Sequence, residues 1–64
     1  MVGYKLTESE AASLVGNEYA EDCYFNPVLD INGIYFIFEQ EVNECINPLF
    51  WWVKDLQQAE YVAP

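Results

Sequence analysis

The chain of 64 residues carries eleven acidic residues against two lysines and no histidine, which gives a formal net charge of −9. This charge repels phosphate, so it argues against direct binding to nucleic acid or to an anionic membrane and favours basic protein partners. Because 53% of the residues are hydrophobic, the acidity does not indicate disorder, and we expect one small folded domain over residues 1–64.

The sequence contains no recognisable export or membrane segment. Met1–Leu6 lacks an apolar stretch of signal-peptide length, and the longest apolar run, Leu49–Val53, is far short of the ~18 to 20 residues of a membrane span. We therefore expect a cytoplasmic protein in which Cys23 and Cys45 are reduced, buried thiols. The sequence does not decide whether they lie within the ~7 Å that a disulfide requires. Two cysteines without a histidine do not complete a usual zinc site unless a second chain contributes ligands. We expect no metal and no cofactor.

The first predicted elements are a strand and a helix. Val2–Leu6 alternates in the manner of a short strand. Thr7 is a good N-cap, and Glu10 three residues later completes a capping box. The spacing of the apolar residues that follow predicts a two-turn helix over Glu8–Val15.

A polar loop and a hairpin are expected next. Asn17–Asp22 is polar and acidic and is predicted as the loop, with one further helical turn as the alternative. Tyr24–Leu29 and Ile34–Phe38 are predicted as the two arms of the hairpin. Between them, Asn32-Gly33 is the strongest short-range hairpin signal, because both turn positions must tolerate positive φ. Pro27 lacks a backbone donor, so the first arm is expected at a sheet edge or to begin only at Val28.

A second short helix is predicted from Glu39. Glu39 and Glu41 occupy its first turn, where acids are favoured, and Asn47-Pro48 ends it. One face of this helix is predicted to carry three apolar residues, Val42, Cys45 and Ile46.

Two strands complete the expected fold. Leu49–Val53 reads as a strand, and Glu60–Val62 is expected to form a short edge pairing with the N-terminal strand. The order β-α-β-β-α-β predicts an α+β fold, with a three- to four-stranded, mainly antiparallel sheet and two short helices on one face.

The predicted strands Ile34–Phe38 and Leu49–Val53 are apolar on both faces, whereas a two-layer domain of this size covers only one. Either the helices, the loops and Tyr19 wrap the second face, or that face stays exposed for a partner or for self-association. One candidate interaction surface is Tyr35, Ile37, Phe50 and Trp52. Phe36, Phe38, Trp51 and Val53 would then form the core, and the reverse assignment of faces is equally open.

Two chemical interpretations are weaker than their structural alternatives. Positions 3, 5, 6 and 12 of an EF-hand loop align with Asp30, Asn32, Gly33 and Glu39. Position 1 is Val28, where an acid is required, so we interpret this segment as a hairpin turn. The carboxylates fall in loops and helix starts, there is no histidine, and no serine or cysteine has a base nearby in sequence. We therefore do not expect an enzyme.

Several short segments resemble a known group of sequences. They are Tyr24-Phe25-Asn26-Pro27-Val28, Asp30, Gly33, Glu41-Val42, Cys45, Asn47-Pro48 and Trp52-Val53-Lys54-Asp55-Leu56. Together they resemble short uncharacterised proteins of bacterial prophages and phages, over about residues 24–62. The resemblance implies no fold, activity or functional residue. It implies only a setting, which is a bacterial cytoplasm or a phage-infected cell.

The leading functional hypothesis is a non-enzymatic interaction module that binds a protein partner or itself, as a homodimer, through an aromatic sheet face. The first alternative is an acidic DNA mimic that occupies the groove of a basic nucleic-acid-binding protein. It would need carboxylates arrayed on one surface at phosphate-like spacing. The second alternative is a small structural or accessory phage protein, which nothing in the residues separates from the first hypothesis.

Overall fold

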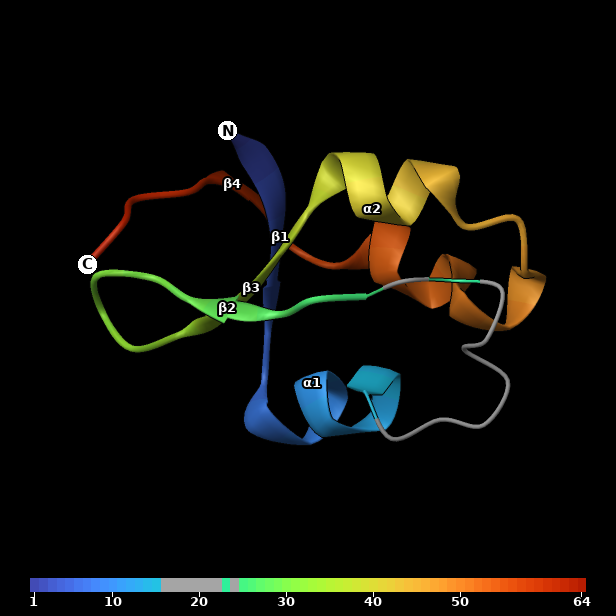
Figure 1. The fold of residues 1–64 in the computed structure, drawn as a ribbon, viewed down its shortest axis with the longest axis horizontal. Helices are drawn as coiled ribbons and strands as arrows, with labels where there is room; N and C mark the ends of the chain where they lie inside the picture. The colour runs from blue at the N-terminus through green and yellow to red at the C-terminus, as the bar shows by residue number, and fades with distance from the viewer. Residues whose placement is uncertain (16–22, 24) are drawn as a thin grey trace.

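The computed structural model describes residues 1–15, 23 and 25–64, and within them four strands form one antiparallel sheet (Figure 1). The strands are β1 (Val2–Leu6), β2 (Val28–Leu29), β3 (Tyr35–Phe38) and β4 (Gln58–Glu60), in the spatial order β2-β3-β1-β4. The helices are α1 (Glu8–Val15), α2 (Glu39–Glu44) and the 3₁₀ helix η2 (Pro48–Asp55). The predicted α+β class is confirmed, whereas the predicted loop Asn17–Asp22 lies outside the described residues.

The structure confirms the first two predicted elements, the strand Val2–Leu6 and the helix Glu8–Val15. Strand β1 lies between β3 and β4, with Tyr4 opposite Ile37 on one side and Gly3 opposite Ala59 on the other. The Glu10 N–H donates to Thr7 Oγ1 (3.1 Å), and the Thr7 N–H donates to Glu10 Oε1 (2.8 Å). This reciprocal capping box satisfies two donors that the first turn of α1 would otherwise leave unpaired.

The hairpin is present, but its turn differs from the predicted two-residue turn. The Asp30 N–H donates to the Ile34 carbonyl (2.9 Å), which closes a loop of three residues, and in the described chain only Gly33 has positive φ, at 74°. The Asp30 carboxylate selects this longer turn, because its Oδ1 accepts from the N–H groups of Asn32 (2.8 Å) and Ile34 (2.9 Å). As predicted from Pro27, β2 is an edge strand that begins at Val28.

The predicted strand Leu49–Val53 is wrong, because these residues lie inside the 3₁₀ helix η2. Asn47-Pro48 was expected to end α2, but α2 already ends at Glu44 with Cys45 as its extended C-cap, and Asn47-Pro48 instead starts the next helix. The Asn47 side chain accepts from the Leu49 N–H (3.1 Å), and Pro48 takes the first helical position, where a missing N–H costs nothing. Ile46, which was predicted on the apolar face of α2, lies beyond the end of that helix and is 79% exposed.

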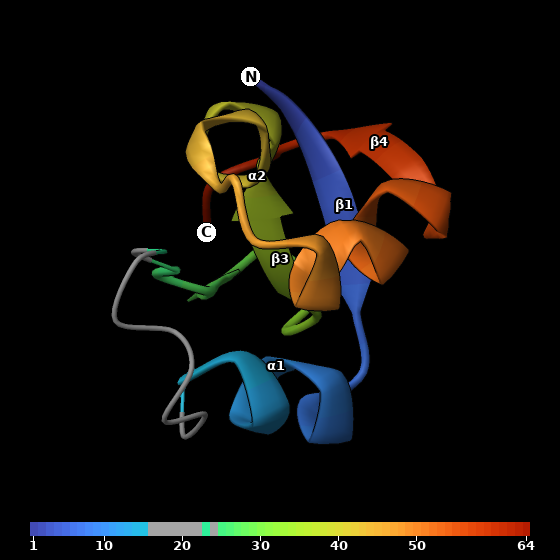
Figure 2. The same cartoon turned by 90° about the vertical axis from the view of Figure 1, so that its right-hand side faces the viewer.

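The main core lies between the sheet and the helices. In Figure 1 the helices lie to the right of β1, and in Figure 2 η2 crosses in front of the sheet, with α2 above it and α1 below it. The buried residues of this core are Tyr4, Leu6, Ala11, Leu14, Cys23, Ile37, Val42, Cys45, Phe50 and Val53. Among the described helices, none has the length and the hydropathy needed to cross a membrane.

The other face of the sheet is covered by the C-terminal segment, which Figure 1 shows running away from the helices toward the hairpin loop. The Tyr61 ring packs on Phe36 and Phe38, with centroid distances of 5.2 and 5.1 Å. The Tyr61 hydroxyl donates to the Leu29 carbonyl (2.9 Å), and the Val62 carbonyl accepts from the Ile31 N–H (2.9 Å). The segment thus crosses the sheet from β4 to β2. Tyr19, the residue expected to help cover this face, lies outside the described residues.

Candidate interaction surface

The four residues predicted to form an interaction surface do not share one exposed face. Ile37 is fully buried and Phe50 is 2% exposed, while Tyr35 and Trp52 are half-buried against the core. Ile37 lies on the face of β3 that the helices cover. Phe50 is buried because it belongs to a helix whose inward positions recur every three residues, rather than to a strand that alternates every two.

The complementary set, which was predicted as core, is also divided. Val53 and Phe36 are buried and Phe38 is half-buried, but Trp51 is 50% exposed. Phe36 and Phe38 lie on the opposite face of the sheet from Val53, so this set does not form one core.

The turns of η2 decide which of its residues face solvent. Three residues per turn place Phe50, Val53 and Leu56 toward the core. A second row consists of Pro48, Trp51 and Lys54, and all three are exposed. Lys54 Nζ lies 5.5 Å from the centroid of the Trp51 ring, in the range of a cation–π contact.

Apolar side chains in and just before the first turn of η2 extend the exposed area around Trp51. Ile46 and Leu49 are exposed, and Pro48 lies between them in the chain. We call this set, Ile46, Pro48, Leu49 and Trp51, the η2 surface. Because it stands on a helix whose inner face is packed in the core, it is held in place without being buried itself.

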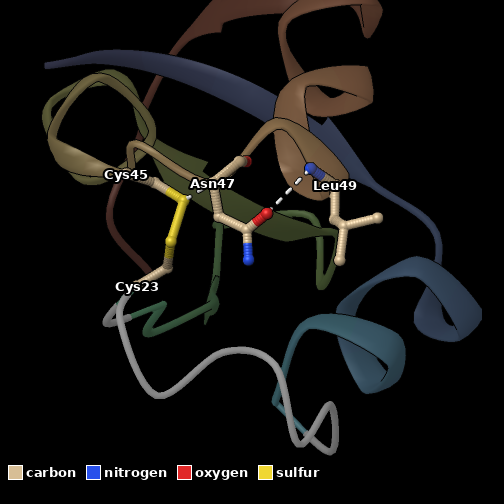
Figure 3. The surroundings of a disulfide bond; sticks show 4 residues. All are labelled: Cys23, Cys45, Asn47 and Leu49. Atoms are coloured by element: carbon tan, nitrogen blue, oxygen red, sulfur yellow. Dashed lines mark hydrogen bonds between the residues drawn. A yellow bond between two sulfur atoms is a disulfide. The ribbon is translucent and has the colours of Figure 1, made fainter.

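A disulfide fixes the chain just before this surface. Cys23 and Cys45 are bonded, with their Cα atoms 4.9 Å apart, so the expectation of reduced thiols is wrong. Figure 3 shows the bond beside Asn47, whose side chain caps η2 through Leu49. The disulfide therefore anchors the segment between α2 and η2 to a distant part of the chain.

Three of the described carboxylates, those of Glu41, Glu60 and Glu39, make structural contacts outside the core. The two oxygens of Glu41 accept from the N–H groups of Asn26 (2.7 Å) and Phe38 (3.4 Å), which ties the segment before β2 to the start of α2. Glu60 pairs with the N-terminal ammonium (2.5 Å), and Glu39 accepts from the Gln58 side chain. Over residues 1–15, 23 and 25–64, no three carboxylates or thiols gather closely enough to hold a metal ion.

The sequence did contain a signal for the η2 surface. Asn followed by Pro is a strong helix start as well as a helix stop, since Asn is a preferred N-cap and Pro a preferred first helical residue. Had the segment been read as a start, a period of three would have separated buried Phe50 and Val53 from exposed Trp51.

A comparison with known protein families, curated proteins and solved structures gives no match. The resemblance to short phage and prophage proteins therefore stays a prediction.

Proposed function

We propose that this chain is a non-enzymatic protein-binding module that contacts its partner through the η2 surface. The observation that carries the proposal is Trp51, which is 50% exposed on a helix anchored in the core by Phe50 and Val53. Tryptophan is among the residues that contribute most to binding energy at protein interfaces. A large ring with only two side-chain torsion angles loses little conformational entropy when a partner covers it.

The net charge of −9 favours a basic partner. Electrostatic attraction between oppositely charged proteins speeds their diffusional encounter, and salt weakens this attraction. The contact with an apolar ring depends much less on salt. We therefore expect association to be slower at high ionic strength while the Trp51 contact still contributes to affinity.

The setting of the protein is part of the proposal. A cytoplasmic location and a bacterial or phage origin are predictions from the sequence alone. The disulfide favours an oxidising compartment, since intracellular reductants keep most thiols reduced. Thiol labelling of the protein in intact cells distinguishes the two locations.

The test is affinity capture from a bacterial extract with the wild-type chain, Trp51→Ala and Ile31→Ala, each at low and high salt. Ile31 is a matched control, because it is an exposed apolar residue on the hairpin loop rather than on η2. We expect Trp51→Ala to weaken binding of the captured protein by about 30-fold, in the range of an interface hot spot, and Ile31→Ala to leave it unchanged.

Other results would point elsewhere. Equal capture by all three proteins would contradict the role of Trp51. The chain could instead capture a DNA-binding protein. If duplex DNA competes for that binding and Trp51→Ala does not weaken it, the result would indicate an acidic DNA mimic. A dimer in sedimentation equilibrium that Trp51→Ala dissociates would identify a second copy of the chain as the partner.

A further inference from the structure

We infer that a cavity beside α1 receives a lysine or arginine side chain of the basic partner, an inference that rests on the proposed binding function. The cavity has a volume of about 210 Å³. It lies between one face of α1 and the hairpin, and its lining residues are Glu8, Ala11, Ala12, Val15, Pro27 and Tyr35.

The walls of the cavity suit the stem of a long cationic side chain. Ala11, Ala12 and Val15 come from one helix, and Pro27 comes from the segment before β2. None of these four side chains offers a polar group, so they can pack against the methylene groups of a long cationic side chain while the rest of the lining is polar. A volume of 210 Å³ also exceeds the ~30 Å³ occupied by one water molecule several times over, which leaves room for a butyl chain.

The charge at the cavity selects the sign of the ligand. Glu8 is the acidic residue of its lining, and neither lysine of the chain lines it, since Lys5 is on β1 and Lys54 is on η2. The N-terminal ammonium pairs with Glu60 instead. Over the described residues neither lysine forms an ion pair with Glu8, and Tyr35, the aromatic residue of the lining, is of a type that attracts cations. An anionic ligand would meet both this carboxylate and the overall charge of −9.

The test of the cavity needs no partner protein. Small molecules are titrated into the chain, and their binding is measured from NMR chemical shifts. The probe is n-butylammonium, and the comparisons are 1-butanol, which has the same stem without the charge, and ammonium chloride, which has the charge without the stem. We expect saturable shifts at Ala11, Ala12 and Tyr35 with butylammonium, with a Kd on the order of 1–10 mM. Butanol should bind several-fold more weakly, and ammonium should give no saturable shift.

Two substitutions distinguish the contribution of the butyl chain to binding from that of the ammonium group. Glu8→Gln should weaken butylammonium about fivefold and leave butanol unchanged. Ala12→Leu should abolish binding of both, because the larger side chain fills the cavity. Both positions are exposed, so the fold should persist, as far-UV circular dichroism checks. Glu44→Gln is the matched control, since it removes one exposed carboxylate that does not line the cavity.

The outcomes are decisive and independent of the η2 surface. An absence of saturable shifts would overturn the site, and equal binding of butanol and butylammonium would overturn the assignment to a cation. Because no partner protein is used, either result leaves the role of Trp51 standing. Conversely, if Trp51→Ala does not weaken binding of the partner protein, the proposed function is contradicted. Binding of butylammonium to the cavity can still be measured in that case.

Discussion

Gly3 of β1 lies directly beneath the ring of Phe36 on β3. A Cβ atom at residue 3 would stand 2.4 Å from Phe36 Cε1 and 2.1 Å from the Ile37 carbonyl oxygen, both far inside van der Waals contact. Phe36 is itself buried, and the Tyr61 ring packs on it. The absence of a side chain at residue 3 is therefore what allows the second face of the sheet to close.

Gly3→Ala should destabilise the fold by about 1–3 kcal/mol, the usual cost of adding a methyl group to a packed interior. Urea denaturation measures the difference. Gly33→Ala is an informative control, because no atom lies within 4 Å of its added Cβ and its cost of about 1 kcal/mol comes only from the φ of 74°. If Gly3→Ala were as stable as the wild-type chain, the close packing of Phe36 on β1 would be incorrect.

Two neighbouring aromatics should respond in opposite ways to truncation. Phe50→Ala removes a buried ring from the core and should cost about 3–5 kcal/mol, enough to unfold a domain of this size. Trp51→Ala removes a half-exposed ring and should cost less than about 1 kcal/mol. Thermal melting followed by circular dichroism compares the two variants. If both variants lost the same stability, residues 50 and 51 would both be packed, as on a strand with two covered faces, and the 3₁₀ helix would be contradicted.

Removal of the disulfide should lower the free energy of unfolding by about 3 kcal/mol, because the bond joins residues 22 apart in sequence and restricts the unfolded chain. The variant is Cys23→Ser with Cys45→Ser, measured by urea denaturation without reductant. Wild-type protein with added reductant provides the control and should fall toward the stability of the variant. Alkylation of both cysteines in untreated native protein would show that the bond is absent and would contradict this prediction.

Tyr61 should contribute through both its ring and its hydroxyl. Tyr61→Phe loses the hydrogen bond to the Leu29 carbonyl and should cost about 1 kcal/mol. Tyr61→Ala also uncovers Phe36 and should cost about 2 kcal/mol, less than a fully buried ring because Tyr61 is half-buried. Hydrogen exchange at Phe36 should accelerate in Tyr61→Ala. Unchanged stability in both variants would show that the C-terminal segment does not pack on the sheet.

Features that depend on neighbours in sequence were predictable. The start of α1 follows from the Thr7–Glu10 capping box, whose partners are three residues apart. The edge position of β2 follows from Pro27, which has no N–H to donate. The hairpin was predicted, but its turn was not, because the Asp30 carboxylate adds hydrogen bonds that lengthen the loop.

The sequence by itself determined the charge, the α+β class and the first helix, because composition and contacts within a few residues control them. Asn47-Pro48 is compatible with the end of one helix and with the start of another, and only the tertiary structure decided between a strand and a helix after it, and so which aromatic rings are exposed. The run Leu49–Val53 suits a strand or a helix equally in isolation, and it is the packing of Phe50 and Val53 against the core that leaves Trp51 in solvent. The pairing of Cys23 with Cys45 and the cover that Tyr61 places over Phe36 join residues 22 or more apart, and no local pattern encodes such contacts.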